Sequence, residues 1–278
     1  MNRHYTQAPL PFHGQKRRWI NDFKAALAKF SDCKIFVDLF GGSGLLSRMV
    51  ADVRPDAVVI YNDFYGYSDR IKAIPQTNAL LADLRTLLAD YPEGKVIKGE
   101  LREKIVSRLQ AEAARGFVDF VTLSSSLLFS SKYKTSLEGF LRETFYNNIR
   151  KSDFNADGYL DGLHVVRKDY MDLFRRWRGH PDVCFLIDPP YLSTDNSTYN
   201  GYWGLRECLD VLETTIGTNY FYFTSNKSEI IDLCAWIGKT YGIATPFNDA
   251  TILRKSTTLN YSAGYTDIMV FKHLSTNH

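Results

Sequence analysis

The sequence predicts an α/β fold built on a mostly parallel sheet. Short apolar runs, such as "KIFVDLF" at 34–40 and "AVVIYND" at 57–63, alternate with segments of helical spacing. Buried parallel strands joined by crossover helices produce this alternation. A glycine-rich turn, "GGSG", follows the first run, and about 100 residues without a good strand follow the second. The long strand-free stretch predicts an insertion in the α/β core.

The apolar runs predict strands, and the segments of helical spacing predict helices. Strands are expected at 34–40, 57–63, 162–166, 183–188 and 219–225, and helices at 16–30, 45–53, 169–178, 203–216 and 226–241. Two further apolar runs, near 249–254 and 265–272, have no helix between them. Because antiparallel strands can be joined by a short turn, these two runs predict a hairpin.

Helical periodicity fills the segment between the second strand and the third. Helices are expected there at 78–91, 99–116 and 136–149. We therefore predict a core domain made of residues 1–70 and 160–278, and an inserted helical domain of residues 71–159. Residues 95–178 carry 16 basic and 11 acidic side chains, whereas residues 179–278 carry 6 and 10. The positive block is either a solvated helical surface or a surface that binds phosphates.

Composition and cysteine content are typical of a cytosolic globular protein. Hydrophobic residues make up 45% of the 278-residue chain and charged residues 23%, so the chain can bury a large core. No apolar run reaches the roughly 18 residues of a membrane span, and the N-terminus has no apolar signal region. The cysteines, at positions 33, 184, 208 and 234, lack metal-ligand spacing and are expected to be reduced. No metal site is expected, and His164 is expected to lie in the core.

The glycine-rich turn is a candidate ligand site. A strand, the turn "DLFGGSG" and a helix bring the backbone close to a ligand at a helix N-terminus. Asp63 ends the next strand 19 residues after Gly44, where its carboxylate could accept hydrogen bonds from ribose hydroxyls. The dinucleotide pattern GxGxxG is not met, whereas S-adenosylmethionine (SAM) has no pyrophosphate, and Asp38 could pair with its amino group. The alternative is a tight strand-to-helix turn without a ligand.

The run "VCFLIDPPY" at 183–191 ends in hydrogen-bond acceptors. Asp188 supplies a carboxylate and Pro189 a carbonyl, while neither Pro189 nor Pro190 has an N–H to donate. Tyr191 offers a flat face on which a base could stack. An amine on an aromatic ring must be drawn towards tetrahedral geometry before it attacks a methyl sulfonium, and acceptors aimed at its protons favour that geometry. The motif therefore predicts a clamp that orients an amine.

These motifs, in this order, resemble those of the Dam-like class of DNA adenine-N6 methyltransferases, and the resemblance covers most of the chain. "PFHGQKRRW" is similar to the family's first cofactor motif, "FVDLFGGSG" to its glycine motif, "YNDFY" to its ribose-binding motif, "HVVRKDYMDLF" to the segment beside the cofactor adenine, and "FLIDPPY" to its catalytic motif. The resemblance implies a Rossmann-like SAM-dependent methyltransferase fold with a seven-stranded sheet. The implied catalytic residues are Asp188, Pro189, Pro190 and Tyr191. The implied cofactor contacts are Phe12, Gly14, Lys16, Asp38, Phe40, Gly41, Gly44, Asp63, Asp169, Tyr170 and Asp188. The first motif departs from the family, because Gln15 stands where a second glycine is usual.

The resemblance also implies that the insertion is a target-recognition domain for duplex DNA. A base inside a duplex must be flipped out before its amine can react. Candidates for binding phosphates, reading bases or filling the vacated stack are Lys132, Tyr133, Lys134, Arg142, Asn147, Asn148, Arg150 and Lys151, and an ordinary surface role stays open for each. Tyr199 and Tyr202 follow the clamp in a polar segment that is expected to close over the flipped base, and these two residues could equally cap the core.

An enzyme of this kind is expected to be cytoplasmic, associated with DNA, and monomeric or weakly dimeric. It could be a lone methyltransferase or the partner of a cognate restriction endonuclease. The same clamp could act on cytosine N4, on adenine in RNA or on a glutamine amide. A further class is a DNA- or SAM-binding module without catalysis, against which the intact Asp38, Asp63 and Asp188 argue.

Overall fold

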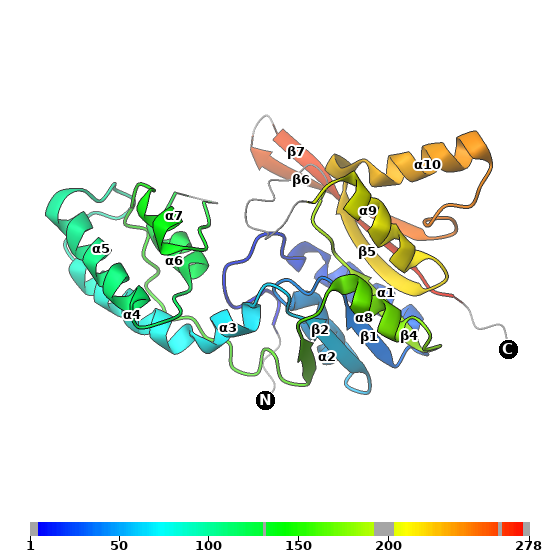
Figure 1. The fold of residues 1–278 in the computed structure, drawn as a ribbon, viewed down its shortest axis with the longest axis horizontal. Coiled ribbons are helices and arrows are strands. Elements are labelled where there is room, and N and C mark those ends of the chain that lie inside the picture. The colour runs from blue at the N-terminus through cyan, green and yellow to red at the C-terminus, as the bar shows by residue number, and fades with distance from the viewer. Residues whose placement is uncertain (1–4, 130–131, 192–202, 261–262, 275–278) are drawn as a thin grey trace. The chain divides into compact units, whose positions relative to one another are not determined.

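The computed structural model describes residues 5–129, 132–191, 203–260 and 263–274. These residues divide into two compact units (Figure 1). Unit 1 consists of Ala8–Gly14 and Gly66–Tyr159. Unit 2 consists of Gln15–Tyr65 and the described residues from Leu160 onward, together with residues 5–7.

Unit 2 is built on a seven-stranded, mostly parallel sheet. Its strands are β1 (Ile35–Asp38), β2 (Val58–Asn62), β3 (Leu163–Val166), β4 (Val183–Ile187), β5 (Asn219–Ser225), β6 (Thr251–Asn260) and β7 (Ala263–Lys272). Their order across the sheet is β3-β2-β1-β4-β5-β7-β6. The strands from β3 to β5 in this order are parallel, and β7 is antiparallel to both β5 and β6. The predicted α/β class and the C-terminal hairpin are confirmed.

Helices cover both faces of this sheet (Figure 1). One face is covered by α1 (Ile20–Leu27) and α2 (Leu45–Val53), and the other by α8 (Tyr170–Trp177), α9 (Leu205–Leu212) and α10 (Ile230–Tyr241). Successive strand residues point to opposite faces, so Phe36 joins the core under α1 and α2, and Val37 joins the core under the other three helices. Every residue of β4 is buried, because this central strand is covered on both faces, and its sequence is therefore apolar throughout.

Three acidic side chains stand at the carboxyl ends of neighbouring strands. Asp38 is the last residue of β1, Asp63 directly follows β2, and Asp188 directly follows β4. Since β1 pairs in parallel with both β2 and β4, these strands end at the same edge of the sheet. Open α/β sheets bind their ligands at this edge.

Unit 1 is largely helical. Its helices are α3 (Tyr67–Lys72), α4 (Ile74–Leu87), α5 (Gly99–Ala113), α6 (Phe120–Leu127) and α7 (Leu137–Leu141). Apolar side chains from these helices and from the segment after α7 form its core: Leu80, Leu84, Ile105, Leu109, Leu123, Leu127, Phe140 and Phe145 are each at most 1% exposed. Among the described residues of both units, no helix is long and apolar enough to cross a membrane.

Most of the expected elements occur within about four residues of their predicted bounds, but two predictions are wrong. The helix expected at 136–149 ends at Leu141, because the segment after it is extended and pairs with residues 95–97. The Ile97 N–H donates to the Phe145 carbonyl (2.8 Å), and the Asn147 N–H donates to the Lys95 carbonyl (2.9 Å). Tertiary pairing therefore overrides the local helical pattern.

His164 is exposed rather than part of the core. It lies on β3, one of the two edge strands of the sheet, and no residue of β3 is fully buried. The apolar letters around it predicted a buried strand, but only the order of strands in the sheet decides which strand lies at the edge.

Candidate active site

The glycine turn after β1 is packed against the ring of Tyr61. A Cβ atom on Gly41 would lie 2.3 Å from Cε2 of this ring and 2.8 Å from a backbone oxygen, which is closer than atoms can approach. Gly44, which precedes α2, faces the same ring, and the Tyr61 hydroxyl donates a hydrogen bond to the Gly42 carbonyl (2.9 Å). Packing on β2 is thus sufficient to require a glycine at position 41, whether or not a ligand binds there.

Asp38 is completely buried at the end of β1. Its Oδ2 accepts a hydrogen bond from the Ser47 hydroxyl (2.7 Å), and its Oδ1 has no hydrogen-bond partner among the described residues. Burial raises the pKa of this carboxyl to about 7 against the effect of the Ser47 hydrogen bond, and the nearby negative charge of Asp188 raises it further. A buried acceptor without a donor is unfavourable. Asp38 therefore offers an oxygen atom to a ligand that carries a cationic or N–H donor group.

Asp188 forms an ion pair with Lys16. The Lys16 Nζ lies 2.6 Å from the Asp188 Oδ2, and the two side chains are 9% and 18% exposed. Burial raises the pKa of Asp188, while the charge and hydrogen bond of Lys16 oppose this rise. The Lys16 ammonium also lies 5.5 Å from the centre of the Tyr191 ring and 5.9 Å from that of Phe223, within the range of a cation–π contact. A lysine predicted to contact the cofactor therefore meets both ends of the predicted amine clamp.

Asp63 is buried after β2 and has protein partners of its own. The Tyr61 hydroxyl, whose one proton is shared with the Gly42 carbonyl, lies 3.2 Å from its Oδ1, and an Arg167 guanidinium nitrogen lies 3.2 Å from its Oδ2. Arg167 is half exposed, so it can move aside without leaving its charge buried. The carboxylate predicted to bind ribose hydroxyls is therefore already oriented within unit 2.

Aromatic rings gather next to the glycine turn. The ring centre of Phe40 lies 4.8 Å from that of Tyr170 and 5.9 Å from that of Trp203. Asp169 is the N-cap of α8, and its side chain accepts hydrogen bonds from two backbone N–H groups in the first turn, at 2.9 and 3.3 Å. The structure thus brings Phe40 and Tyr170 together and uses the Asp169 carboxylate as a helix cap.

Two of the predicted cofactor contacts, Phe12 and Gly14, belong to unit 1. The Phe12 ring meets the Tyr67 ring edge-on, with centres 5.8 Å apart. Their contribution to a cofactor site remains a prediction.

The predicted phosphate-binding lysines of unit 1 share one carboxylate. Lys132 and Lys134 each lie 2.9 Å from an oxygen of Glu143. The two hydrogen bonds lower the pKa of Glu143, so this carboxylate stays ionised at neutral pH. Glu143 occupies the position that a phosphate would take between the two lysines.

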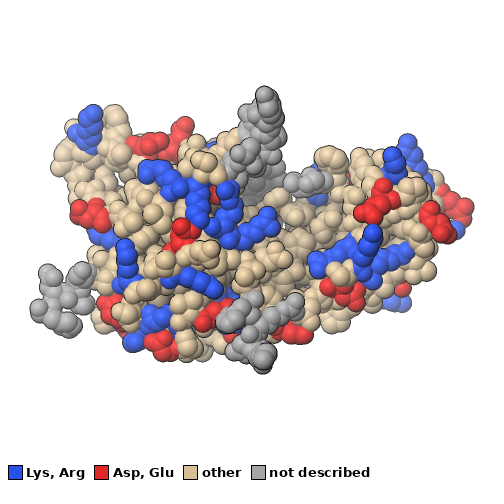
Figure 2. Space-filling view, turned by 180° about the vertical axis from the view of Figure 1, so that it is seen from behind, with Lys and Arg blue, Asp and Glu red and all other residues tan. Residues whose placement is uncertain are grey.

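Other predicted DNA contacts are also engaged within unit 1. Arg142 and Lys151 pair with exposed glutamates, and the Arg150 guanidinium lies 4.5 Å from the centre of an aromatic ring. The Asn147 side chain donates to a backbone carbonyl (2.7 Å), whereas Asn148 is exposed. Figure 2 shows the same mixture, since basic side chains alternate with acidic ones on the face it presents. Tyr199 and Tyr202 lie outside the described residues.

One group of potential metal ligands lies at the opposite edge of the sheet. Asp32, Cys33 and His273 each offer a ligand atom, and these atoms lie within 4.8 Å of one another. The spacing of these residues along the chain gave no sign of this proximity. The Arg54 guanidinium donates to the Cys33 carbonyl (2.9 Å), and a positive charge so close disfavours a bound cation.

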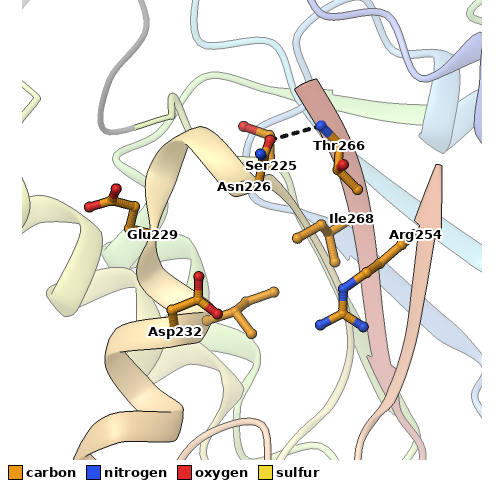
Figure 3. A pocket seen from close by; sticks show the side chains of 8 residues that line it. Ser225, Asn226, Glu229, Asp232, Arg254, Thr266 and Ile268 are labelled. Atoms are coloured by element: carbon orange, nitrogen blue, oxygen red, sulfur yellow. Dashed lines mark hydrogen bonds between the residues drawn. The ribbon is translucent and has the colours of Figure 1, made fainter. Parts of the chain in front are cut away.

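A cavity of about 140 Å³ opens beside the carboxyl end of β5 (Figure 3). Asp232, near the start of α10, faces Arg254 of β6 across it, and Glu229 borders it with its carboxylate turned away from Arg254. Asn226 borders the cavity and accepts a hydrogen bond from the Thr266 N–H (2.8 Å). Its walls carry charges of both signs, and its lining includes none of the predicted site residues that the structure describes.

Three residues that the sequence reasoning missed complete these groups. Ser47, in the first turn of α2, donates to Asp38, and its place one turn after the glycine loop was a usable signal. Arg167 lies two residues before Asp169 in a motif that was already recognised. Glu143 gave no signal, because one acidic residue in a mixed-charge segment predicts nothing by itself.

This chain is similar in sequence to a curated protein. A curated protein of Haemophilus influenzae strain Rd, named "Putative methyltransferase", is 37% identical to this chain over 235 residues, which cover 82% of this chain and 78% of the relative. No protein-family model matches the chain. Identity at this level, over most of both chains, indicates common descent and a shared fold.

Proposed function

Because this chain belongs to a methyltransferase family, we propose that it transfers a methyl group from SAM to the N6 amine of adenine in a short duplex DNA sequence. The observation that carries the proposal is the sequence Asp188-Pro189-Pro190-Tyr191 at the carboxyl end of β4, next to the buried Asp38 at the end of β1. Asp188 can accept a hydrogen bond from an amine, and Asp38 can accept one from a cationic group. Because these acceptors stand at the ends of adjacent strands, they suit a reaction between a cofactor and a second substrate.

The residues at this edge suit SAM. The Asp38 Oδ1, which is buried and has no donor among the described residues, would accept the α-ammonium group. Asp63, oriented by Arg167 at 3.2 Å, would accept the ribose hydroxyls, and the rings of Phe40 and Tyr170 would lie near the adenine. When bound, SAM supplies a methyl group activated by its positively charged sulfur, so the protein needs no nucleophile of its own.

Asp188 would orient the target amine. Lys16 holds its Oδ2 at 2.6 Å, which leaves Oδ1 to accept a hydrogen bond from adenine N6, and the Pro189 carbonyl would accept the second one. These bonds draw the nitrogen towards tetrahedral geometry and stabilise the positive charge that develops on it. After transfer, N6 carries one proton too many, and Asp188, whose pKa is raised by burial, is suited to accept it.

Tyr191 would stack on the flipped base. Its ring already forms one wall of the space around the Lys16 ammonium, 5.5 Å from its centre. Flipping a base costs a few kcal/mol, and stacking on an aromatic ring returns about 1–3 kcal/mol. The tyrosine would therefore offset much of the cost of taking the base out of the duplex.

Unit 1 would hold the DNA. Lys132 and Lys134 lie on one short segment, and a phosphate could displace Glu143 from between them, at 2.9 Å from each. The surplus of basic residues over residues 95–178 would add a sequence-independent attraction that weakens with salt. In the ion pairs of Lys132 and Lys134, DNA phosphates would then replace the carboxylate of Glu143.

Incubation with labelled SAM and mixed-sequence duplex DNA tests the proposal. Hydrolysis to nucleosides identifies the modified base, and mapping of the modified sites identifies the sequence. We expect N6-methyladenine in one short sequence with the wild type, and none with Asp188→Asn. Asp56→Asn is the matched control, because this carboxylate is 50% exposed in the turn before β2, at the other edge of the sheet.

Other results would contradict the proposal. If the label were found on cytosine N4 or only in RNA, adenine in DNA would be the wrong substrate, although Asp188 would still orient an amine. SAM binding without transfer to any nucleic acid would point to a protein amide or to a module without catalysis.

A further inference from the structure

The first predicted cofactor motif begins in unit 1, where α3 holds it. The Tyr67 hydroxyl donates to the Leu10 carbonyl (3.1 Å) and accepts from the Leu10 N–H (2.9 Å). Arg70 of the same helix donates to the Pro11 carbonyl (2.8 Å). These bonds engage the N–H and the carbonyl of Leu10 and the carbonyl of Pro11, so they fix the backbone at these two residues.

The same arginine is tied to α6. Arg70 pairs with Asp119 at 2.9 Å, with the two side chains 10% and 1% exposed, and donates to the Thr122 hydroxyl (3.1 Å). Asp119 is also the N-cap of α6. Since breaking a buried ion pair of this kind is strongly destabilising, Arg70 holds the backbone at Pro11 to α6, and the segment from Phe12 to Gly14 begins at this anchor.

His13 meets the predicted DNA-reading segment directly. Its ring centre lies 4.3 Å from that of Tyr133, with an interplanar angle of 62°. Tyr133 stands between Lys132 and Lys134, which Glu143 holds. A DNA phosphate that replaces Glu143 releases residues 132–134 from this carboxylate, so Tyr133 and the His13 ring packed on it are free to shift with the DNA.

Only two residues separate His13 from Lys16. Gly14 has φ +78°, a left-handed conformation that other residues adopt only with strain, and the chain passes into unit 2 between Gly14 and Gln15. Lys16 then reaches Asp188 at 2.6 Å. Three residue steps span at most about 10 Å, so the chain between His13 and Lys16 is too short to absorb a large displacement of His13.

We propose that His13 is a positioning residue that transmits the binding of DNA at residues 132–134 to Lys16, and through Lys16 to Asp188. The inference rests on the proposed function. Bound DNA shifts Tyr133 and the His13 ring, and the shift moves the Lys16 ammonium on the Asp188 carboxylate. The amine clamp is thereby aligned for transfer only when DNA is bound.

The test compares His13→Ala and His13→Phe with the wild type. Because His13 is exposed, His13→Ala should leave thermal stability, SAM affinity and DNA affinity within about twofold of wild type, while kcat for transfer to duplex DNA falls about tenfold, a typical coupling between sites. His13→Phe keeps a ring against Tyr133 and should restore kcat. The matched control is His180→Ala, which removes another exposed histidine ring packed on an aromatic residue, with centres 5.0 Å apart.

A second readout follows the Lys16 ammonium by side-chain nitrogen NMR, assigned with Lys16→Arg. Duplex DNA should shift this signal in the wild type and in His13→Phe, but not in His13→Ala. If His13→Ala abolishes the shift although no methyl is transferred to DNA, the coupling stands and the proposed function fails. If DNA is methylated but kcat and the shift survive in His13→Ala, or if DNA never shifts the signal, the coupling is overturned.

Discussion

Replacing Asp38 with asparagine should stabilise the cofactor-free protein at pH 8 and weaken its binding of SAM. The Asp38 carboxylate is completely buried, one of its oxygens has no donor among the described residues, and burial raises its pKa from 3.8 to about 7. The charge is therefore unfavourable until a ligand neutralises it. Asparagine keeps the size of the side chain, and its oxygen can still accept the Ser47 hydroxyl.

The sign of the effect follows from proton binding. The folded protein binds the Asp38 proton more tightly than the unfolded chain does. The contribution of Asp38 to the free energy of unfolding therefore falls as the pH rises from about 4 to about 7, and it is constant above pH 7. The rise in the pKa of Asp38 from 3.8 to about 7 corresponds to a loss of about 4 kcal/mol of folding stability once the carboxyl is ionised. The asparagine N–H₂ group is left without an acceptor at a cost of about 1–3 kcal/mol. The net gain for Asp38→Asn at pH 8 is then about 1–3 kcal/mol.

Thermal unfolding of the cofactor-free protein between pH 5 and pH 8 measures this gain. We expect Asp38→Asn to melt higher than wild type at pH 8, by about 2–4 °C per kcal/mol, and the difference to disappear towards pH 5. Asp172→Asn, at a carboxylate that is 71% exposed, is the control and should match wild type throughout. A difference that does not change with pH, or a variant less stable than wild type at pH 8, would refute the reasoning.

Binding of SAM should respond in the opposite direction. The variant lacks the charge that would hold the α-ammonium group, and a hydrogen bond to a charged group contributes about 1.5–3 kcal/mol. Calorimetry should therefore show affinity for SAM about 10- to 100-fold weaker than in the wild type at pH 8. Wild-type affinity should itself decline as the pH falls below about 7, because Asp38 then takes up a proton. Unchanged affinity in Asp38→Asn would place the ammonium group elsewhere.

Three further predictions concern the ion pairs and the glycine turn. Lys16→Met leaves Asp188 buried without its cation, which raises the pKa of that carboxyl further. The acid limb of the pH profile for methyl transfer should therefore move to higher pH. An unchanged acid limb would mean that Lys16 does not control the protonation of Asp188 during transfer. Glu143→Gln removes the carboxylate that competes with phosphate, so DNA affinity should rise several-fold at low salt and its dependence on salt should steepen; equal affinity would place the DNA elsewhere. Gly41→Ala puts a methyl group 2.3 Å from the Tyr61 ring and should lower stability by about 1–3 kcal/mol, measurable by denaturant unfolding, and a neutral effect would show that the turn can shift.

The edge of the sheet that carries the candidate site could be predicted from the sequence, because the order of strands and acidic residues is a local pattern. Apolar runs that alternate with helical spacing predicted the α/β class, and parallel strands necessarily end at one edge. Asp38, Asp63 and Asp188 could therefore be assigned to that edge from their positions after apolar runs. The hairpin of β6 and β7 followed from the missing helix between the two runs.

Contacts between residues far apart in the chain could be decided only by the tertiary structure. Which elements pack together decides that Lys16 pairs with Asp188 and that Glu143 pairs with two lysines. It also decides that one oxygen of Asp38 has no donor among the described residues. The wrong helix after Leu141 and the exposed His164 have the same cause. A local pattern predicts how a segment would fold by itself, whereas pairing with a distant strand or a place at the edge of the sheet is settled by the whole fold.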